Sequence, residues 1–253
     1  MRAPDELRAL VEGYLDELAL TPELGGLAEP VRYAIGGKRF RPVIALAVGE
    51  AAGAEPERIL PAAAAVELVH SFSLVHDDLP ALDDDDTRRG QPSVHAAYGE
   101  AVAILAGDAL LAEAFRLALS YRTPAVAREL VGATLAMIGG QHLDITGSAD
   151  LDELHRLKTG ALFSASVGCA LWAAGVPEAE QGLWRAFADE LGLLFQVVDD
   201  ILDGDGVAET QGVEGARVLA DEAAARARSR LLEIDADTTV LAEIVEGLVT
   251  RTG

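Results

Sequence analysis

The sequence predicts an all-α fold in a single domain. Half of the 253 residues are apolar and only 5% are aromatic, while strand-like runs of alternating apolar and polar residues are hard to find. The prolines fall at the starts or breaks of helical segments, where they cost least. No linker rich in Gly, Ser or Pro and no long internal repeat divides the chain, so one domain over residues 1–253 is the economical interpretation.

Helical periodicity predicts ten segments, most of them with a proline near the first residue. In chain order they are 4–20, 27–36 with Pro30, 40–53 with Pro42, 57–79 with Pro56 and Pro61, 93–105 with Pro92, 107–120, 124–146 with Pro124, 150–175, 177–203 with Pro177, and 214–250. Segment 57–79 is apolar on most of its faces, as in "ILPAAAAVELVHSFSLVH", which predicts a central place in the bundle.

Composition and charge exclude several classes of protein. The formal net charge is −22, and the phosphate backbone of a nucleic acid is held by Lys and Arg patches that this chain lacks, so nucleic acid is a poor partner. No run of about 18 uninterrupted apolar residues predicts a membrane span. The first residues lack the basic and apolar regions of a signal peptide, so we expect the cytoplasm. The single cysteine, Cys169, excludes a disulfide framework.

The first acidic cluster is "LVHDDLPALDDDDTRRG", residues 74–90. In an unbroken helix Asp84 would align with Asp77 and Asp83 would not. Pro80 ends or distorts the helix, so the aspartates after it can fold back toward Asp77. The spacing therefore leaves both Asp83 and Asp84 open as partners of Asp77.

The second acidic cluster is "FQVVDDILDGDG", residues 195–206, at the end of an apolar segment. Asp199 and Asp203 are four residues apart and Gln196 is three before Asp199, so we expect the three side chains on one helix face. A divalent cation would offset the repulsion between the carboxylates. Hard oxygen ligands without Cys or paired His favour Mg²⁺.

Basic residues lie beside glycine in two further motifs. The only lysines are Lys38 in "GGKRFRP" and Lys158 in "RLKTGALFS". Lys38 and Arg41 are three apart at a helix start, where free amides also favour an anion. Arg88 and Arg89 close the first acidic cluster with two more guanidinium groups. Two carboxylate sets with several cationic sites indicate a substrate that carries diphosphate, with room for more than one such group.

In this order the motifs resemble those of the trans-isoprenyl diphosphate synthases, specifically the bacterial farnesyl and geranylgeranyl diphosphate synthases. The resemblance runs through "GGKRFRP", "ELVHSFSLVHDDLPALDDDDTRRGQPSVH", "AGDALL", "GGQHLD", "KTGALF" and "FQVVDDILD", most of residues 30–205. It implies an isoprenoid-synthase-type helical bundle around a deep central cavity, normally a homodimer. The two Asp-rich motifs would face each other across the cavity mouth.

The resemblance also implies a Mg²⁺-dependent prenyltransferase that condenses isopentenyl diphosphate with an allylic diphosphate. About three Mg²⁺ ions would bind the allylic diphosphate through Asp77, Asp83, Asp199 and Asp203, supported by Asp78 and Asp200. The implied groups around isopentenyl diphosphate are Lys38, Arg41, His70 and Arg89. Those on the allylic side are Arg88, Lys158, Thr159 and Gln196. Asp77, Asp83, Asp199 and Lys158 are the implied catalytic set.

Product length is the next expectation. The product tail grows into the cavity, so a bulky residue below the first Asp-rich motif stops it. Phe72, five residues before Asp77, is aromatic as in family members that stop at fifteen carbons. The resemblance therefore favours farnesyl over geranylgeranyl diphosphate.

One departure keeps alternatives open. The family usually continues after the second motif with a GKxxGxD loop, whose lysine binds the allylic diphosphate, but here no lysine follows Lys158. The loss of one charged contact costs about 1.5 to 3 kcal/mol. A non-catalytic or weakly active partner subunit of a prenyl synthase is therefore the main alternative. A terpene-cyclase-like enzyme is a second one, although it would not need the isopentenyl site of "GGKRFRP".

Overall fold

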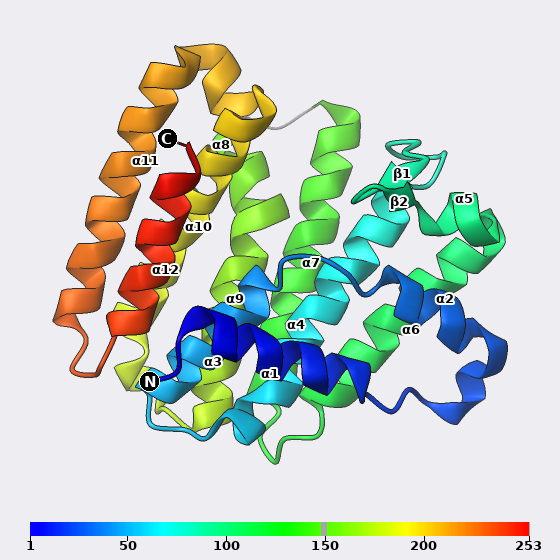
Figure 1. The fold of residues 1–253 in the computed structure, drawn as a ribbon, viewed down its shortest axis with the longest axis horizontal. Helices are drawn as coiled ribbons and strands as arrows, with labels where there is room; N and C mark the ends of the chain where they lie inside the picture. The colour runs from blue at the N-terminus through cyan, green and yellow to red at the C-terminus, as the bar shows by residue number, and fades with distance from the viewer. Residues whose placement is uncertain (148–150, 253) are drawn as a thin grey trace.

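Helix α4 (Pro56–Asp77) runs through the middle of the bundle, as its apolar sequence predicts (Figure 1). It packs against α3 (Phe40–Ala51), α6 (Glu100–Ala118) and α9 (Ala161–Ala174). The computed structural model describes residues 1–147 and 151–252. Within them the buried apolar side chains form one continuous cluster, which reaches from α1 to α12.

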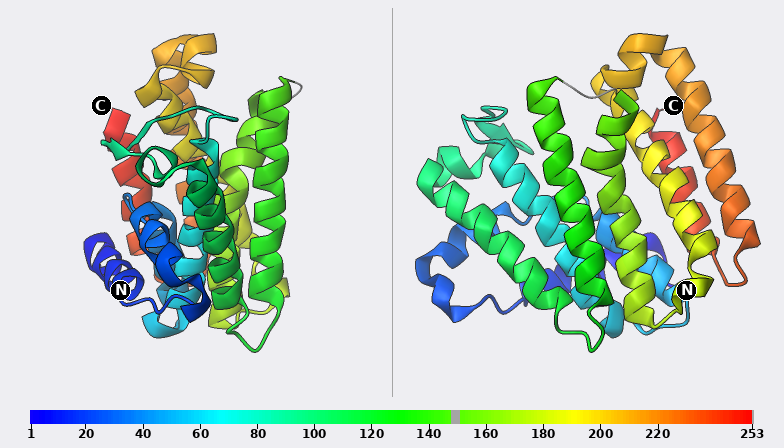
Figure 2. Two further views of the ribbon diagram at one scale, coloured as in Figure 1. Left: turned by 90° about the vertical axis from the view of Figure 1, so that its right-hand side faces the viewer. Right: turned by 180° about the vertical axis from the view of Figure 1, so that it is seen from behind.

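The remaining elements surround this centre. They are α1 (Pro4–Asp16), α2 (Ala28–Ala34), β1 (Thr87–Arg88), β2 (Gln91–Pro92), α5 (Val94–Tyr98), α7 (Ala125–Thr146), α8 (Leu151–His155), α10 (Gly182–Asp203), α11 (Gly206–Glu233) and α12 (Thr239–Val249). Short 3₁₀ turns η1 (Pro22–Leu27), η3 (Glu178–Glu180) and η4 (Thr250–Thr252) connect or end helices. Seen from behind, α6 and α7 lie side by side on the outer face (Figure 2).

Two predicted boundaries were wrong around Gly107. The segments 93–105 and 107–120 meet instead at Gly99, whose φ of 88° and ψ of 153° end α5 and precede α6. Gly107 lies inside α6 and is buried, because a side chain of α4 packs directly against it. A glycine within a helical pattern can thus mark close packing instead of a break.

The predicted helix 214–250 is two helices. The chain reverses after Ile234, and Asp237 accepts hydrogen bonds from the backbone amide and hydroxyl of Thr239 as α12 begins. The reversal buries the apolar face of α12 and brings the end of the chain back toward α10 and α3. An acidic residue two before a threonine is the local signal for this turn.

The predicted helix 150–175, whose first residue lies outside the described residues, contains a π-helical turn. This turn, η2 (Arg156–Gly160), holds Lys158 and Thr159 and separates α8 from α9. Such turns interrupt α-helices mostly at functional sites. No periodicity in the sequence marks it.

A small antiparallel hairpin follows the first acidic cluster. Thr87 pairs with Pro92 and Arg88 with Gln91, and the turn residues Arg89 and Gly90 have φ values of 55° and 77°. Positive φ at both positions is typical of the two-residue turn that matches strand twist. The hairpin fixes the two arginines at the edge of the bundle.

Among the described residues, two helices are long and apolar enough to cross a membrane by length and composition alone, Pro56–Asp77 and Glu153–Ala174. More than half of each lies buried against other helices of the bundle. Core helices of this kind pass the same test as membrane spans.

Candidate active site

The first acidic cluster folds back on the end of α4. The helix stops at Asp77, before Pro80, and the backbone amide of Asp83 donates a 2.9 Å hydrogen bond to the carbonyl of Asp77. The pKa of the Asp77 carboxyl is raised to about 6, mainly by burial and in part by the nearby Asp83 and Asp78 carboxylates, while the charge of Lys158 opposes the shift. Asp84 has a left-handed φ of 55°, and its backbone amide donates instead to the carbonyl of Leu79 at 3.2 Å. The structure therefore places Asp83 beside Asp77.

Asp199 and Asp203 lie in the last turn of α10, which ends at the same end of the bundle as α4 (Figure 1). Burial raises the pKa of Asp199, and repulsion from Asp203 adds to the shift. Both acidic clusters therefore hold carboxylates whose charged form is disfavoured until a cation approaches.

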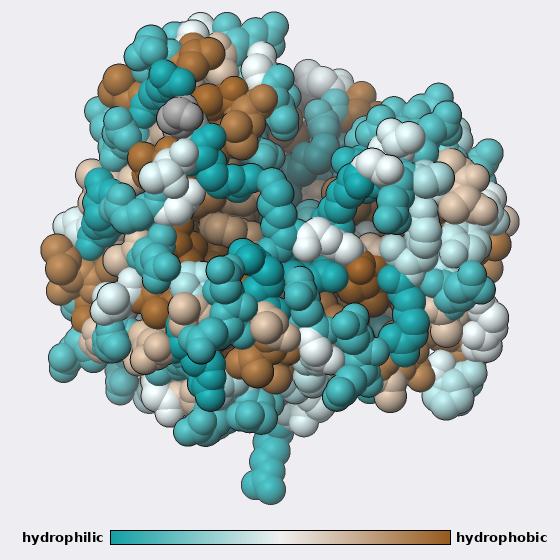
Figure 3. Space-filling model, in the orientation of Figure 1, coloured by the Kyte–Doolittle hydropathy of each residue, from teal (hydrophilic) through white to brown (hydrophobic). Residues whose placement is uncertain are grey.

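Most of the predicted cationic residues line one cavity of about 640 Å³, here called the cationic cavity. Lys38, Arg41, His70, Arg88, Arg89 and Asp199 all contribute to it. In the space-filling view the surface is mostly hydrophilic and is hollowed between the part formed by α11 and α12 and the part formed by the hairpin and α5 (Figure 3). The sequence motifs thus converge in space although 160 residues separate Arg39 from Asp199.

Arg41 is held by aromatic rings. Its guanidinium carbon lies 4.5 Å from the ring centre of Phe163 and 5.5 Å from that of Phe195. Burial lowers the pKa of Arg41 to about 10, so it stays charged at neutral pH, and its Nε is buried without a hydrogen-bond partner. A positioned, incompletely paired guanidinium suits an anionic ligand.

His70 lies in the same cavity among arginines. Burial lowers the pKa of the His70 imidazole well below its ordinary value, and Arg41 and Arg89 add to that effect. The ring is therefore neutral at pH 7 and acts through hydrogen bonds instead of charge.

The glycine pair of "GGKRFRP" makes room for Arg89. A Cβ atom on Gly37 would lie 2.5 Å from the guanidinium carbon of Arg89, and Gly37 has a φ of 112°. Arg39, by contrast, points inward and pairs with Glu67 at 2.8 Å. Arg39 is therefore paired with an acidic residue in the wall of the cationic cavity, and Lys38 lines the same cavity outside that pair.

Arg88 is already paired. Its guanidinium group donates to the buried carboxylate of Asp78, at 2.9 Å from Nε and by a second short contact, and to Asp85 at 3.1 Å. The carboxylate of Asp78 is therefore paired with Arg88. The resemblance had implied instead that Asp78 supports metal binding.

A second, mostly apolar cavity of about 310 Å³ lies on the other face of α4; we call it the apolar cavity. It is lined by Phe72, Ser73, His76, Asp77, Leu82, Met137, Ile138, Gln141, His142, Ile145 and Lys158. Lys158 Nζ is 2.6 Å from Asp144 Oδ2, and its charge opposes the rise in the pKa of Asp77. The structure thus brings Phe72, Asp77 and Lys158 together. Thr159 lies next to Lys158 on the same π-helical turn.

The prediction that Gln196 faces the same way as Asp199 was wrong. Gln196 Nε2 donates a 2.7 Å hydrogen bond to Asp200, and Gln196 lines a different cavity from Asp199. Asp200 is 2% exposed and also accepts a 2.9 Å bond from the backbone amide of Val207. A buried carboxylate needs such donors. Asp200 therefore links α10 to α11 through Val207 and accepts a hydrogen bond from the side-chain amide of Gln196.

Sequence reasoning missed Arg251. This residue, in the η4 turn at the end of the chain, lines the cationic cavity beside Asp199, and its charge opposes the rise in the pKa of Asp199. It comes from more than 200 residues after "GGKRFRP" and lies in no motif. Only the return of α12 toward α10 places it there.

A comparison with known families decides what kind of site this is. Residues 25–223, more than half of the chain, match the family described as polyprenyl synthetase. The chain belongs to the polyprenyl synthetase family. Its members are prenyltransferases, and the resemblance seen in the sequence motifs is thereby confirmed.

Individual members of this family are similar over most of the chain. A geranylgeranyl diphosphate synthase of Cyanophora paradoxa is 39% identical over 217 residues, which cover 78% of this chain and 72% of that protein. A farnesyl diphosphate synthase of Bacillus subtilis is 41% identical over 193 residues, 70% of this chain and 65% of that protein. A solved geranyltransferase structure from Legionella pneumophila has a TM-score of 0.84 at 32% identity and covers 98% of this chain and 96% of that one. The all-α isoprenoid synthase fold is therefore confirmed.

The family typically uses Mg²⁺, and the donor set can be tested for that ion. Among residues 1–147 and 151–252, no three His, Cys, Asp or Glu side chains converge as a preformed metal cage. Mg²⁺ is commonly bound by one or two carboxylates together with waters and phosphate oxygens of the substrate. Crowded carboxylates at the ends of α4 and α10 fit that mode of binding, in which the substrate completes the shell.

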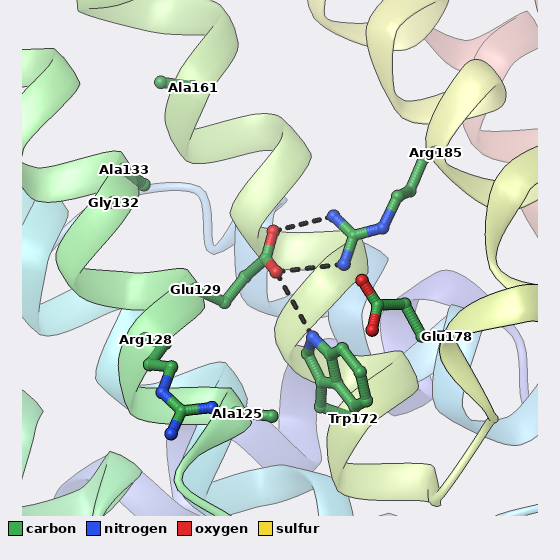
Figure 4. A pocket seen from close by; sticks show the side chains of 9 residues that line it. All are labelled: Ala125, Arg128, Glu129, Gly132, Ala133, Ala161, Trp172, Glu178 and Arg185. Atoms are coloured by element: carbon green, nitrogen blue, oxygen red, sulfur yellow. Dashed lines mark hydrogen bonds and ion pairs between the residues drawn. The ribbon is translucent and has the colours of Figure 1, made fainter.

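Another pocket, of about 570 Å³, holds none of the predicted residues. In it Glu129 accepts hydrogen bonds from Arg185 at 2.8 and 2.9 Å and from the indole nitrogen of Trp172 at 3.3 Å (Figure 4). A Cβ atom on Gly168 would overlap Glu129, so α9 needs glycine there. The charges satisfy one another, and the group joins α7, α9 and α10.

Proposed function

We propose that this chain is a Mg²⁺-dependent prenyltransferase that condenses isopentenyl diphosphate with an allylic diphosphate. The observation that carries the proposal is the pair of cavities on the two faces of α4, one cationic and one apolar, each with a carboxylate of an Asp-rich cluster. The cationic cavity offers groups that bind diphosphate, and the apolar cavity offers space for the growing apolar tail. The similarity to named farnesyl and geranylgeranyl diphosphate synthases supports the same reaction.

Each cavity supplies part of the chemistry. Lys38, Arg41 and Arg89 offer three cations to the diphosphate of isopentenyl diphosphate, and neutral His70 offers a hydrogen bond. Lys158 lies beside Asp77 at the top of the apolar cavity, where it would stabilise the charge on the leaving pyrophosphate. Mg²⁺, when bound, supplies further stabilisation of that charge. The described site needs no nucleophilic side chain, since the carbon–oxygen bond of the allylic substrate ionises.

The reaction can be tested with the purified chain alone. Incubation with isopentenyl diphosphate and geranyl diphosphate in Mg²⁺ is expected to yield a prenyl diphosphate that is longer by five carbons, identified by mass spectrometry. Only Gly204 and Asp205 separate α10 from α11, which is itself interrupted at Gly212, and no lysine lies in this region. The missing lysine contact favours the partner-subunit alternative. If the chain by itself makes no product but changes the product length of an active synthase that is added to it, the partner-subunit alternative is supported.

Arg251 offers an answer to the missing lysine. It adds a cation to the active-site region from the end of the chain, on the α10 side where the lysine loop is absent. We propose that it binds substrate diphosphate in place of that lysine.

We propose a fifteen-carbon product, because Phe72 lines the apolar cavity below Asp77 and is only 7% exposed. Phe72→Ala removes the ring that narrows this cavity and is expected to shift the main product to twenty carbons or longer. Product analysis by mass spectrometry checks this. An unchanged product spectrum in a folded variant would refute the role of Phe72.

We also propose that the protein is a cytoplasmic homodimer. Large apolar side chains are exposed on the outer face of α6 and α7, namely Ile104, Leu105, Val131, Leu135, Ile138 and Ile145. In a chain with a charge of −22, this stretch of α7 carries no acidic residue between Glu129 and Asp144, so two copies can meet there without repulsion. Sedimentation should show a dimer that Leu135→Glu dissociates; a monomeric wild-type protein would overturn the proposal.

A further inference from the structure

The wall of the apolar cavity that faces α6 is built by a histidine. Of the described residues that line this cavity, Phe72, Ser73, His76 and Asp77 come from α4 and most others from α7, but none comes from α6. His76 lies between the cavity and α6. The width of the cavity on that side is therefore set by where the His76 ring lies.

The position of the ring is fixed by two contacts with α6. His76 Nε2 is 3.1 Å from the backbone carbonyl oxygen of Ile104. One turn further, Gly107 presents bare backbone to the ring, and a Cβ atom built on Gly107 would overlap three ring atoms of His76. Gly107 is buried inside a helix and has no unusual φ, so the contact with the His76 ring explains why a glycine is found there.

The same ring supports the residue proposed to limit product length. The rings of Phe72 and His76 meet edge to face, with centres 5.0 Å apart and planes at 71°. Edge-to-face pairs prefer a defined geometry, so a displaced His76 displaces Phe72 as well. Phe72, His76 and Gly107 therefore form one packed series from the cavity to α6.

We infer that His76 is a second product-length residue of this enzyme and that Gly107 is the positioning residue that holds it out of the cavity. The inference rests on the proposed prenyltransferase function and concerns the product of that same site. It assigns product length to the whole series, not to Phe72 alone.

Substitution of Gly107 tests the packed series Phe72, His76 and Gly107 at its α6 end. In Gly107→Ala the methyl group takes the place of the His76 ring, which must turn toward the cavity. Alanine favours a helix more than glycine does, so the effect comes from this contact. We expect the ratio of fifteen-carbon to ten-carbon product to fall by about tenfold or more, the discrimination that one methylene gives in an apolar pocket.

Removal of the ring should have the opposite effect. His76→Ala opens the cavity toward α6, and we expect more product of twenty carbons or longer. In the double variant the methyl group of Gly107→Ala occupies the space that the ring has left. The double variant should therefore return fifteen-carbon product to within about threefold of wild type, because the two substitutions act on one contact and are not additive.

A matched control separates this from a general loss of stability. Gly132 lies inside α7 with no atom within 4 Å of its would-be Cβ, so Gly132→Ala should leave the product spectrum unchanged. The inference fails if active Gly107→Ala keeps the wild-type product ratio, or if the double variant makes no more fifteen-carbon product than Gly107→Ala. If the wild-type protein makes no prenyl diphosphate, the proposed function itself fails, and the two failures are thereby distinguished.

Discussion

Asp77→Asn is expected to lower kcat at least about 1000-fold, which corresponds to about 4 kcal/mol of transition-state stabilisation. Asparagine has nearly the same shape and keeps the backbone carbonyl that accepts a hydrogen bond from Asp83. It removes the charge that a divalent cation requires, at a carboxyl whose pKa is already raised to about 6 by burial. Steady-state rates with isopentenyl and geranyl diphosphates at saturating Mg²⁺ measure the loss.

Asp235 provides the matched control for this change. It is an exposed aspartate in the loop between α11 and α12, remote from both cavities, so Asp235→Asn should change kcat by less than about twofold. If Asp77→Asn retained more than a tenth of wild-type activity, the carboxylate at the end of α4 would not be a metal ligand.

Arg41→Gln is expected to raise the KM for isopentenyl diphosphate by about 100-fold, with a smaller effect on kcat. A charge-assisted hydrogen bond contributes about 1.5 to 3 kcal/mol, and here the guanidinium is fixed between the rings of Phe163 and Phe195. Arg41→Lys should recover little, because an ammonium group has neither the planar fork nor the stacking of a guanidinium.

Arg251→Gln should raise a substrate KM by about tenfold, less than Arg41→Gln, because the guanidinium of Arg41 is desolvated and held between two aromatic rings. Arg230, an arginine of α11 whose side chain is 43% exposed and paired with Glu233, is the control, and Arg230→Gln should leave both KM values unchanged. If the KM of Arg41→Gln for isopentenyl diphosphate stayed within threefold of the wild-type value, Arg41 would not be a residue that binds isopentenyl diphosphate.

Local pattern was sufficient to predict α4 and the return of the acidic cluster. The apolar run of α4 and Pro80 after it are properties of neighbouring residues, and the structure confirms that the helix ends before Pro80, at Asp77 instead of the predicted residue 79. The choice of Asp83 over Asp84 was not accessible to spacing, because it depends on a loop whose amide bonds back to the Asp77 carbonyl.

The errors have a common physical cause in long-range packing. The predicted boundary between residues 105 and 107 was wrong, because Gly107 lies inside α6 and makes room for a ring from α4. Gln196 looked like a neighbour of Asp199, but the buried Asp200 needed its amide. Arg251 belongs to no motif and reaches the cationic cavity only because α12 folds back on α10.

The central claim is that the two Asp-rich helix ends bind an allylic diphosphate through Mg²⁺. Calorimetric titration with a thiolodiphosphate analogue of geranyl diphosphate, which does not ionise, tests it most directly. We expect binding in Mg²⁺ to be at least about 100-fold tighter than in EDTA, a difference of about 3 kcal/mol, and to weaken to the EDTA level in Asp77→Asn. Equal affinity in Mg²⁺ and EDTA would contradict the claim.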